Sequence, residues 1–275
     1  MLYSLSEFDV LSCPQCDFVF LSVSPDRNTL QEMYGTSYFQ ERAEYFVSKQ
    51  LAGPIEAAND ATLSDFRQVL SVIEKFCPSG KLLDVGCGAG VFLGLARSRG
   101  FDAYGVEISP FAARLAQQHL GPKVVQGTLE ETSFPAGYFD VVTMLDVFEH
   151  FTKPLAELRL AAQLLRPDGL LVINTPNERA LLRKLARVAY VASLGRIVYP
   201  VTKLYHEYHL SYFSRLSLLR SLNECGFEIR LMGSKPMLGV KGRASPLLRK
   251  ALRGFSWVEG LLDMQYELLA VARKA

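Results

Sequence analysis

The 275-residue chain lacks any apolar run close to the roughly 20 residues that a membrane-spanning helix requires. Its first residues, Met1 to Glu7, lack the basic and then apolar order of a secretory signal peptide. Five cysteines are few for this length and odd in number, which is unlike the disulfide framework of a small secreted protein. These absences lead us to expect a cytoplasmic protein with reduced thiols.

An excess of charge of either sign is also missing. The 30 basic and 28 acidic residues leave a formal charge of +2, so no global field attracts nucleic acid. Hydrophobic residues make up 49% of the chain and charged residues 21%, values typical of globular proteins rather than disordered ones. We therefore expect a globular protein, with no nucleic acid as its partner.

Strands and helices alternate along residues 81–174. Residues that typically begin and end helices occur at the expected boundaries, such as Ser109 before Pro110 and Gly121 after a helical segment. Alternation of this kind needs crossover connections, which build a parallel sheet with helices on both faces. The expected strands are 82–85, 102–106, 124–126, 139–145 and 170–174, and the expected helices begin at Val91, Pro110 and Pro154.

Two further parts lie outside this alternation. Between residues 4 and 22, β-prone runs flank Cys13-Pro14-Gln15-Cys16, which predicts a small hairpin without a core. Aromatic residues recur among charges in residues 26–50, as in short helices that cap a neighbouring domain. We expect residues 1–58 to form a hairpin and cap segment and residues 59–275 a main domain, with a lid insertion at about 178–210.

The run Leu-Leu-Asp-Val-Gly-Cys-Gly-Ala-Gly, residues 82–90, joins a strand to a helix through a glycine turn. Glycines let the backbone turn sharply and let a ligand approach main-chain amides where a Cβ would collide, so this loop is typical of a cofactor site. In the dinucleotide fingerprint the third glycine stands five residues after the first, whereas here that position is Val91. An NAD-linked oxidoreductase is therefore disfavoured.

A carboxylate ends the next strand. Glu107 lies about 20 residues beyond the glycine loop, where an acid in α/β nucleotide-binding folds accepts hydrogen bonds from ribose hydroxyls. The alternative is a solvated surface carboxylate, but the end of a buried strand is a poor place for an unpaired charge. We expect Glu107 to bind a ribose.

Several motifs in a fixed order resemble those of class I S-adenosylmethionine-dependent methyltransferases, over about two thirds of the chain. They are Asp84-Val-Gly-Cys-Gly-Ala-Gly90, Glu107, Gln126-Gly127, Phe139-Asp140-Val141-Val142 and Leu165-Arg166-Pro167-Asp168-Gly169. The resemblance implies an α/β, doubly wound, Rossmann-like fold with a seven-stranded, mostly parallel sheet. It also implies that the final strand, Gln265–Arg273, runs antiparallel between the fifth and sixth strands.

The same resemblance implies S-adenosylmethionine as cofactor and S-adenosylhomocysteine as product. It places the methionine portion near Asp84 and the glycine loop, and the ribose and adenine near Glu107. The cofactor-binding residues that it implies are Asp84, Gly86, Cys87, Gly88, Gly90, Glu107, Ile108, Gly127, Thr128, Leu129, Leu145 and Asp146. Many relatives have an aspartate where this chain has Thr128, and Glu130 or Glu131 is the candidate to compensate.

Histidines supply the candidate catalytic base. Methyl transfer to a weak nucleophile needs a group that removes the acceptor's proton, and His150 follows the fourth strand at the carboxyl edge of the sheet, where such folds bind ligands. The alternative is a histidine that only caps the next turn. His206 and His209 precede Tyr212-Phe213 in a run that lines the acceptor pocket of similar methyltransferases. Their spacing differs from a helical His-x-x-x-His pair and the sequence offers no third ligand, so we expect no metal.

Cys13 and Cys16 form half of a zinc knuckle, which needs four ligands. The segment 11–38 resembles the end of a zinc ribbon found on some methyltransferases that act on nucleotide sugars or glycans. The other cysteines, Cys77, Cys87 and Cys225, have the character of small buried residues.

The stretch Arg179–Tyr205 mixes basic and apolar residues at a spacing compatible with amphipathic helix. One interpretation is peripheral contact with an anionic membrane, as similar insertions occur in ubiquinone-biosynthesis O-methyltransferases. The other is a lid over the acceptor, with its basic residues solvated. We expect a methyltransferase that acts on an oxygen, nitrogen or carbon nucleophile, with a sugar or glycan as the leading acceptor class. The alternatives are a lipid or quinone precursor and a non-catalytic cofactor-binding module.

Overall fold

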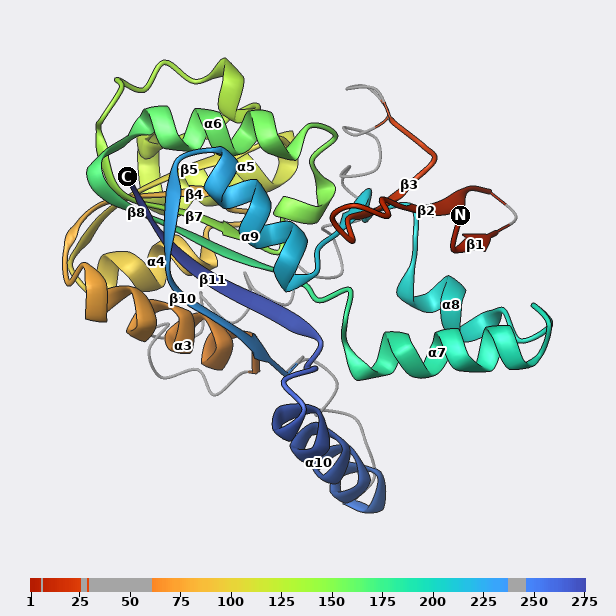
Figure 1. The fold of residues 1–275 in the computed structure, drawn as a ribbon. Helices are drawn as coiled ribbons and strands as arrows, with labels where there is room; N and C mark the ends of the chain where they lie inside the picture. The colour runs from red at the N-terminus through yellow and green to blue at the C-terminus, as the bar shows by residue number, and fades with distance from the viewer. Residues whose placement is uncertain (6, 26–28, 30–60, 237–245) are drawn as a thin grey trace.

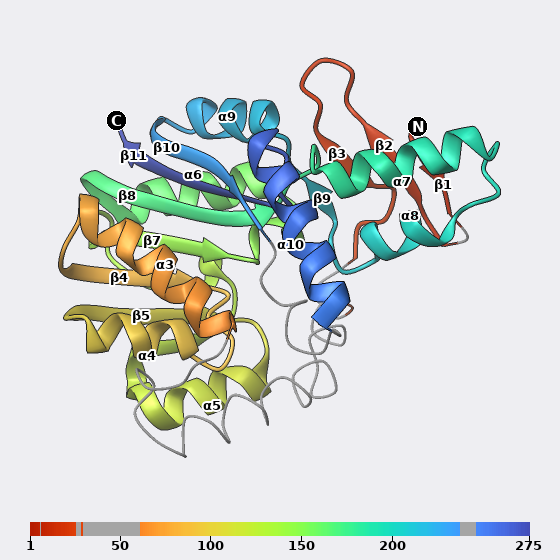
Figure 2. The same ribbon diagram turned by 90° about the horizontal axis from the view of Figure 1, so that it is seen from below.

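The computed structural model describes the chain except residues 6, 26–28, 30–60 and 237–245. The expected cap at residues 26–50 and the expected domain boundary at 58 and 59 therefore lie outside the described residues. The described chain forms two sheets. Figures 1 and 2 show the larger sheet between two layers of helices, with the smaller sheet and helices α7, α8 and α10 beyond one end of it.

The larger sheet has the topology that the resemblance implies. Its spatial order is β10-β11-β8-β7-β4-β5-β6, and β11 pairs antiparallel with both β8 and β10. Its strands are β4 (Gly80–Val85), β5 (Phe101–Glu107), β6 (Val124–Gln126), β7 (Phe139–Leu145), β8 (Leu165–Pro176), β10 (Phe227–Lys235) and β11 (Glu267–Lys274). The expected fold class is thus confirmed, including the antiparallel final strand.

Both faces of the larger sheet are buried, because apolar residues occupy successive strand positions. Leu82 belongs to a core cluster with Phe92 of α4, while its neighbour Leu83 belongs to a second cluster with Leu158 of α6. The covering helices are α3 (Ala61–Phe76), α4 (Val91–Ser98), α5 (Pro110–Leu120), α6 (Pro154–Leu164) and α9 (Arg215–Glu224). Figure 1 shows α6 and α9 on one face of the sheet and α3 with α4 on the other.

The smaller sheet corrects the expectation of a hairpin without a core. Its order is β1 (Tyr3–Ser4), β2 (Asp9–Ser12), β3 (Val19–Leu21) and β9 (Ser211–Tyr212). Val10 and Leu21 pack in a cluster with Val201 and Tyr205 of the lid insertion. The N-terminal strands gain a core because a segment some 190 residues away in the chain supplies both the fourth strand and the packing surface.

The turn between β2 and β3 holds the two cysteines of the half knuckle. Asp17 after the second cysteine has φ 59, and its N–H donates to the Cys13 carbonyl at 3.1 Å. Within the described residues, Cys13 and Cys16 belong to no group of three metal-ligating side chains. Whether they bind zinc stays a prediction.

The amphipathic stretch forms two helices, α7 (Leu181–Ala192) and α8 (Tyr199–Leu204). A third helix beyond this end of the larger sheet, α10 (Pro246–Leu261), was not expected from the sequence. No helix in the described part of the chain is both long and apolar enough to cross a bilayer.

One basic residue of α7 is not solvated, contrary to the lid interpretation. Arg183 is 2% exposed, and its guanidinium lies 4.6 Å and 4.5 Å from the ring centres of Tyr205 and Tyr212. It donates to the Leu204 carbonyl at 2.8 Å and pairs with Glu178 at 3.9 Å. Arg183 therefore fastens α7 to α8 and the smaller sheet.

We predict that Arg183→Ala lowers the free energy of unfolding by about 3–5 kcal/mol, because it leaves the Glu178 carboxylate buried without its cation. Lys184→Ala, an exposed neighbour on the same helix, should change it by less than about 0.5 kcal/mol. Urea unfolding followed by circular dichroism measures both. Equal stability of the two variants would show that Arg183 does not hold the lid.

Candidate active site

The glycine loop connects β4 to α4 at the carboxyl end of the sheet. Gly86, Gly88 and Gly90 have φ values of 73°, 53° and 81°, in the left-handed region that favours glycine. A Cβ on Gly86 would lie 2.5 Å from the Val147 side chain, so no larger residue fits there. The N–H of Gly86 donates to the Val106 carbonyl at 2.8 Å, which fixes the loop against the end of β5.

Glu107 lies directly beneath this loop. The carboxylate is 4% exposed, and it accepts hydrogen bonds from the N–H of Gly88 and of Ser109, each at 2.8 Å. Burial raises the pKa of Glu107, although these N–H groups act in the opposite direction. Glu107 is thus the buried acid that the sequence predicted, and it holds the glycine loop and the start of α5 in one arrangement.

The loop after β6 lies beside Glu107. The N–H of Gly127 donates to the Glu107 carbonyl at 2.9 Å, and Leu129 is buried. Thr128 begins a short 3₁₀ turn, and its N–H donates to the Glu131 carboxylate at 2.9 Å. Of the two acids considered as replacements for the missing aspartate, Glu131 therefore caps this turn.

Asp84 at the end of β4 is a second buried acid. Its carboxylate accepts a hydrogen bond from the Thr143 hydroxyl at 2.6 Å and is 4% exposed. Burial raises its pKa to about 7, against the effect of that hydrogen bond. A group with this pKa changes charge readily when a cation arrives.

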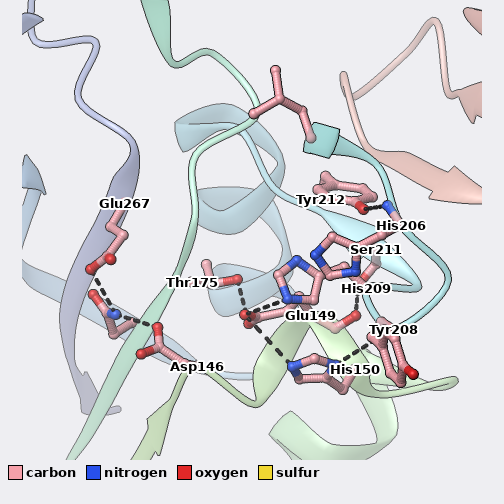
Figure 3. A network of polar contacts seen from close by, with 12 residues as sticks. Asp146, Glu149, His150, Thr175, His206, Tyr208, His209, Ser211, Tyr212 and Glu267 are labelled. Atoms are coloured by element: carbon pink, nitrogen blue, oxygen red, sulfur yellow. Dashed lines mark hydrogen bonds and ion pairs between the residues drawn. The ribbon is translucent and has the colours of Figure 1, made fainter. Parts of the chain in front are cut away.

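Asp146 follows β7 and belongs to a chain of polar contacts across three strands (Figure 3). Its φ is 53°, and its carboxylate accepts a hydrogen bond from the Asn174 amide at 2.6 Å. The same amide donates to Glu267 at 3.1 Å, and Lys235 pairs with Glu267 at 2.9 Å. Asp146 itself is exposed, unlike Asp84 and Glu149.

Sequence reasoning missed Asn174, Lys235 and Glu267. Each lies near the end of a separate strand, and Lys235 also pairs with Asp65 of α3 at 2.6 Å. No motif marks these residues, since their proximity results from the order β10-β11-β8-β7. The one feature of the sequence that could have indicated these residues is that each is polar and adjoins an apolar run.

Glu149 is the most deeply buried acid at this edge of the sheet. It is 1% exposed, and its carboxylate accepts a hydrogen bond from the Thr175 hydroxyl at 2.9 Å. Burial, and then the charge of Asp146, raises the pKa of Glu149 well above its ordinary value. The sequence analysis treated Glu149 only as the neighbour of His150.

The three candidate histidines come together around Glu149, as Figure 3 shows. The Nε2 atoms of His150 and His209 lie 3.9 Å and 3.8 Å from Glu149 Oε1. The ring of His209 lies 4.7 Å from that of His150 and 4.1 Å from that of His206, centre to centre. Residues that are more than 50 positions apart in the chain thus form one cluster.

The tautomer of His150 follows from its partner. Its Nδ1 is hydrogen-bonded to the Tyr208 carbonyl oxygen, which can only accept, so Nδ1 carries the proton. Nε2 is then the nitrogen that can take up a proton, and it faces the Glu149 carboxylate, which stabilises the resulting imidazolium. This arrangement is suited to general-base chemistry.

The same cluster offers a set of metal ligands. One atom each from Glu149, His150 and His209 lies within 4.8 Å of the others. The sequence argument against a metal rested on the absence of a third ligand, and the structure supplies Glu149 and His150 beside His209. Two imidazoles and a carboxylate are donors that zinc and similar divalent cations accept.

Residues 56–231 match the protein family described as Methyltransferase domain. A mitochondrial ubiquinone biosynthesis O-methyltransferase of Schizosaccharomyces pombe is 32% identical over 144 residues, which are 49% of this chain and 52% of that protein. A ubiquinone biosynthesis O-methyltransferase of Psychrobacter arcticus is 34% identical over 106 residues, 36% of this chain and 41% of that protein. The chain thus spans about half the length of the curated relatives it matches.

Solved structures share the fold at low sequence identity. A putative sarcosine dimethylglycine methyltransferase from Galdieria sulphuraria aligns with a TM-score of 0.57 and 19% identity, over 81% of this chain and 90% of that one. Geranyl diphosphate C-methyltransferase from Streptomyces coelicolor aligns with a TM-score of 0.54 and 13% identity, over 77% of this chain and 79% of that one. At these identities the comparison supports the fold alone.

We predict that Asp84→Asn reduces the loss of stability on raising the pH from 5 to 8. Burial raises the pKa of Asp84 from its ordinary 3.8 to about 7 in the folded protein, so the folded state holds an extra proton and loses stability as pH rises through this range. Asn cannot ionise and should remove about 1–3 kcal/mol of this pH dependence.

The matched control is Asp168→Asn, because the Asp168 side chain is exposed. Urea unfolding of the three proteins at both pH values measures the effect. Identical pH dependence in the wild type and Asp84→Asn would refute the titration assigned to Asp84.

Proposed function

The chain belongs to the methyltransferase-domain family of S-adenosylmethionine-dependent enzymes, and we propose that it methylates a hydroxyl oxygen on an apolar small molecule such as a phenolic quinone precursor. The observation that carries this proposal is the buried cluster of Glu149, His150 and His209 at the end of β7. A base of this kind is needed when the acceptor is a hydroxyl whose proton must leave during attack.

The residues at the carboxyl edge of the sheet fit S-adenosylmethionine. Glu107 uses one acceptor position of each oxygen for backbone N–H groups, and the remaining lone pairs can accept from ribose hydroxyls. Burial raises the pKa of Asp84 to about 7, so a cationic cofactor shifts it to the charged form. Glycines at positions 86, 88 and 90 have no Cβ, so the cofactor can approach the backbone of the loop closely.

When bound, S-adenosylmethionine would supply an electrophilic methyl group, with S-adenosylhomocysteine as the second product. His150 would accept the proton of the acceptor hydroxyl at Nε2, while the Tyr208 carbonyl keeps Nδ1 protonated. The charged form of Glu149 would stabilise the imidazolium, and the Thr175 hydroxyl orients the Glu149 carboxyl group. The Nε2 of His209 lies 3.8 Å from the same Glu149 oxygen, and the Ser211 hydroxyl of β9 donates to the Glu149 carbonyl at 3.4 Å.

The acceptor class follows from two considerations. Relatives of this chain act in ubiquinone biosynthesis as O-methyltransferases, which favours a lipid or quinone precursor over the sugar that the sequence analysis placed first. The half knuckle at Cys13 and Cys16 favours the sugar, through its resemblance to methyltransferases that act on nucleotide sugars or glycans. We place the quinone precursor first because both of these relatives, at 32% and 34% identity, are ubiquinone biosynthesis O-methyltransferases.

We predict that labelled methyl groups enter the organic phase when the protein is incubated with methyl-labelled S-adenosylmethionine and cell extract. A prenylated or otherwise apolar phenol partitions there, whereas a sugar nucleotide stays in water. Heat-inactivated protein is the control. Label in the aqueous phase would replace the quinone precursor with a sugar, and no transfer to either phase would favour the non-catalytic module.

We predict that His150→Ala lowers kcat by about 10²–10⁴-fold, the usual contribution of a general base, with little change in S-adenosylhomocysteine affinity. Glu149→Gln should lower kcat less, since His150 keeps its tautomer through Tyr208. His119→Ala is the matched control, as His119 is exposed on α5. Calorimetry with S-adenosylhomocysteine and initial rates between pH 6 and 9 measure these effects.

A kcat equal to that of the wild type in His150→Ala would refute the assignment of His150 as the general base. The same assays after dialysis against a chelator separate base from metal chemistry. Retained activity supports the base, whereas loss that Mg²⁺ or Zn²⁺ restores would reassign Glu149, His150 and His209 as ligands.

A further inference from the structure

Large apolar side chains are exposed on two helices beyond the end of the sheet. On α7 and the loop to α8 they include Val188 at 64%, Val191 at 62% and Leu194 at 87% exposure. On α10 and the residue after it they are Trp257, Val258, Leu261 and Leu262, with Trp257 at 67%. We call these residues the apolar rim, which also includes Leu182, Leu185, Ile197 and Tyr199.

The exposed apolar side chains outnumber the buried ones on both helices. On α7 the side chains of Arg183 and Ala186 are buried, and among the described side chains of α10 only Glu259, at 6% exposure, is buried. The rim residues of α10 recur at helical spacing, with Trp257 four residues before Leu261 and Val258 four before Leu262. Each helix thus presents a row of large apolar side chains to solvent.

The two halves of the rim are neighbours. The N–H of Leu181 at the start of α7 donates to the Met264 carbonyl at 2.8 Å, just beyond α10. Lys184 of α7 also reaches the Met264 sulfur at 3.7 Å. Figures 1 and 2 show both helices at the end of the sheet where β8 ends, which is the edge that holds Glu149 and the histidines.

Basic residues are frequent in the sequence of both helices that carry the rim. From Arg179 to His206 the sequence contains six Arg or Lys and no Asp or Glu, and Lys184, Arg187 and Arg196 are exposed. The sequence of α10 contains Arg249, Lys250 and Arg253 against one acid, Glu259. Apolar side chains next to exposed cations are the combination that anionic lipid surfaces attract, because lipid buries the first and phosphate pairs with the second.

We propose that the apolar rim docks this protein on an anionic lipid bilayer, with α7 and α10 lying in the interface and Trp257 at the headgroup level. Aromatic rings with a polar edge favour that depth. A second copy of the chain is a poorer occupant, since a symmetric interface would bring the two sets of cations together. The docking does not depend on the proposed acceptor, although it would place the carboxyl edge of the sheet next to the membrane.

Trp257 is the only tryptophan of the chain, so its fluorescence reports on the rim directly. Mixing the intact protein with phosphatidylglycerol-containing vesicles should shift the emission to shorter wavelength, and lipids brominated on the acyl chain should quench it. Vesicles of phosphatidylcholine alone should give a much smaller effect, and salt should weaken binding because it screens the cations. The readout requires neither cofactor nor acceptor.

The double variant Val188→Glu and Val191→Glu should reduce binding to the anionic vesicles by at least about tenfold, because it adds two anions at the lipid contact. The matched control, Leu216→Glu and Leu219→Glu, changes two exposed leucines at the same spacing on α9, outside the rim. Unchanged S-adenosylhomocysteine binding in both variants verifies that they fold. If the wild-type protein did not bind S-adenosylhomocysteine, that result would count against the proposed function but not against the docking.

An unshifted emission with anionic vesicles would overturn the docking. So would equal loss of binding in the two double variants, which would assign the effect to net charge. A blue-shifted emission without vesicles that rises with protein concentration, together with a dimer in analytical ultracentrifugation, would make the rim an interface between copies of this chain.

Discussion

Parallel pairing of β7 with β4 and β8 is the constraint on which the site depends. It brings the loops after these strands to one edge of the sheet, so Asp84, Asp146 and Thr175 lie at neighbouring strand ends. The same pairing buries Asp84 and, beside Thr175, Glu149. Burial raises the pKa of both acids, and each accepts a hydrogen bond from a neutral hydroxyl, that of Thr143 or Thr175. A cationic ligand at this edge of the sheet would therefore favour the ionised form of these acids.

The lid side of the molecule depends on a different contact. Arg183 pairs with Glu178 and stacks against tyrosines of α8 and β9, so a buried cation joins the insertion to the smaller sheet. The strand β9 ends in Tyr212, whose hydroxyl accepts a hydrogen bond from the N–H of His206. The arrangement of the lid and that of the histidine cluster are therefore connected through one tyrosine. The α7 part of the apolar rim belongs to the same insertion.

Much of the fold could be predicted from residues 80–176, because strands buried on both faces appear as apolar runs and the helices between them carry caps and glycines. The glycine loop and Glu107 could be predicted for the same reason, since a turn and a strand end are local features. The smaller sheet could not, because β1, β2 and β3 complete their core with residues near 201–212. The helix α10 also escaped sequence reasoning, and Trp257, Val258 and Leu261 in its described part are exposed rather than packed in a core.

The sequence by itself determined the fold class, the cofactor loop and the candidate histidines, since these depend on short-range spacing and on chemistry that few residue types provide. Only the tertiary structure decided that Glu149 lies between His150 and His209, that Arg183 is buried rather than solvated, and that α7 and α10 form one rim. The physical reason is that each of these facts depends on contacts between segments distant in the chain. Side-chain burial, and hence charge state, is a property of those contacts and not of the residue.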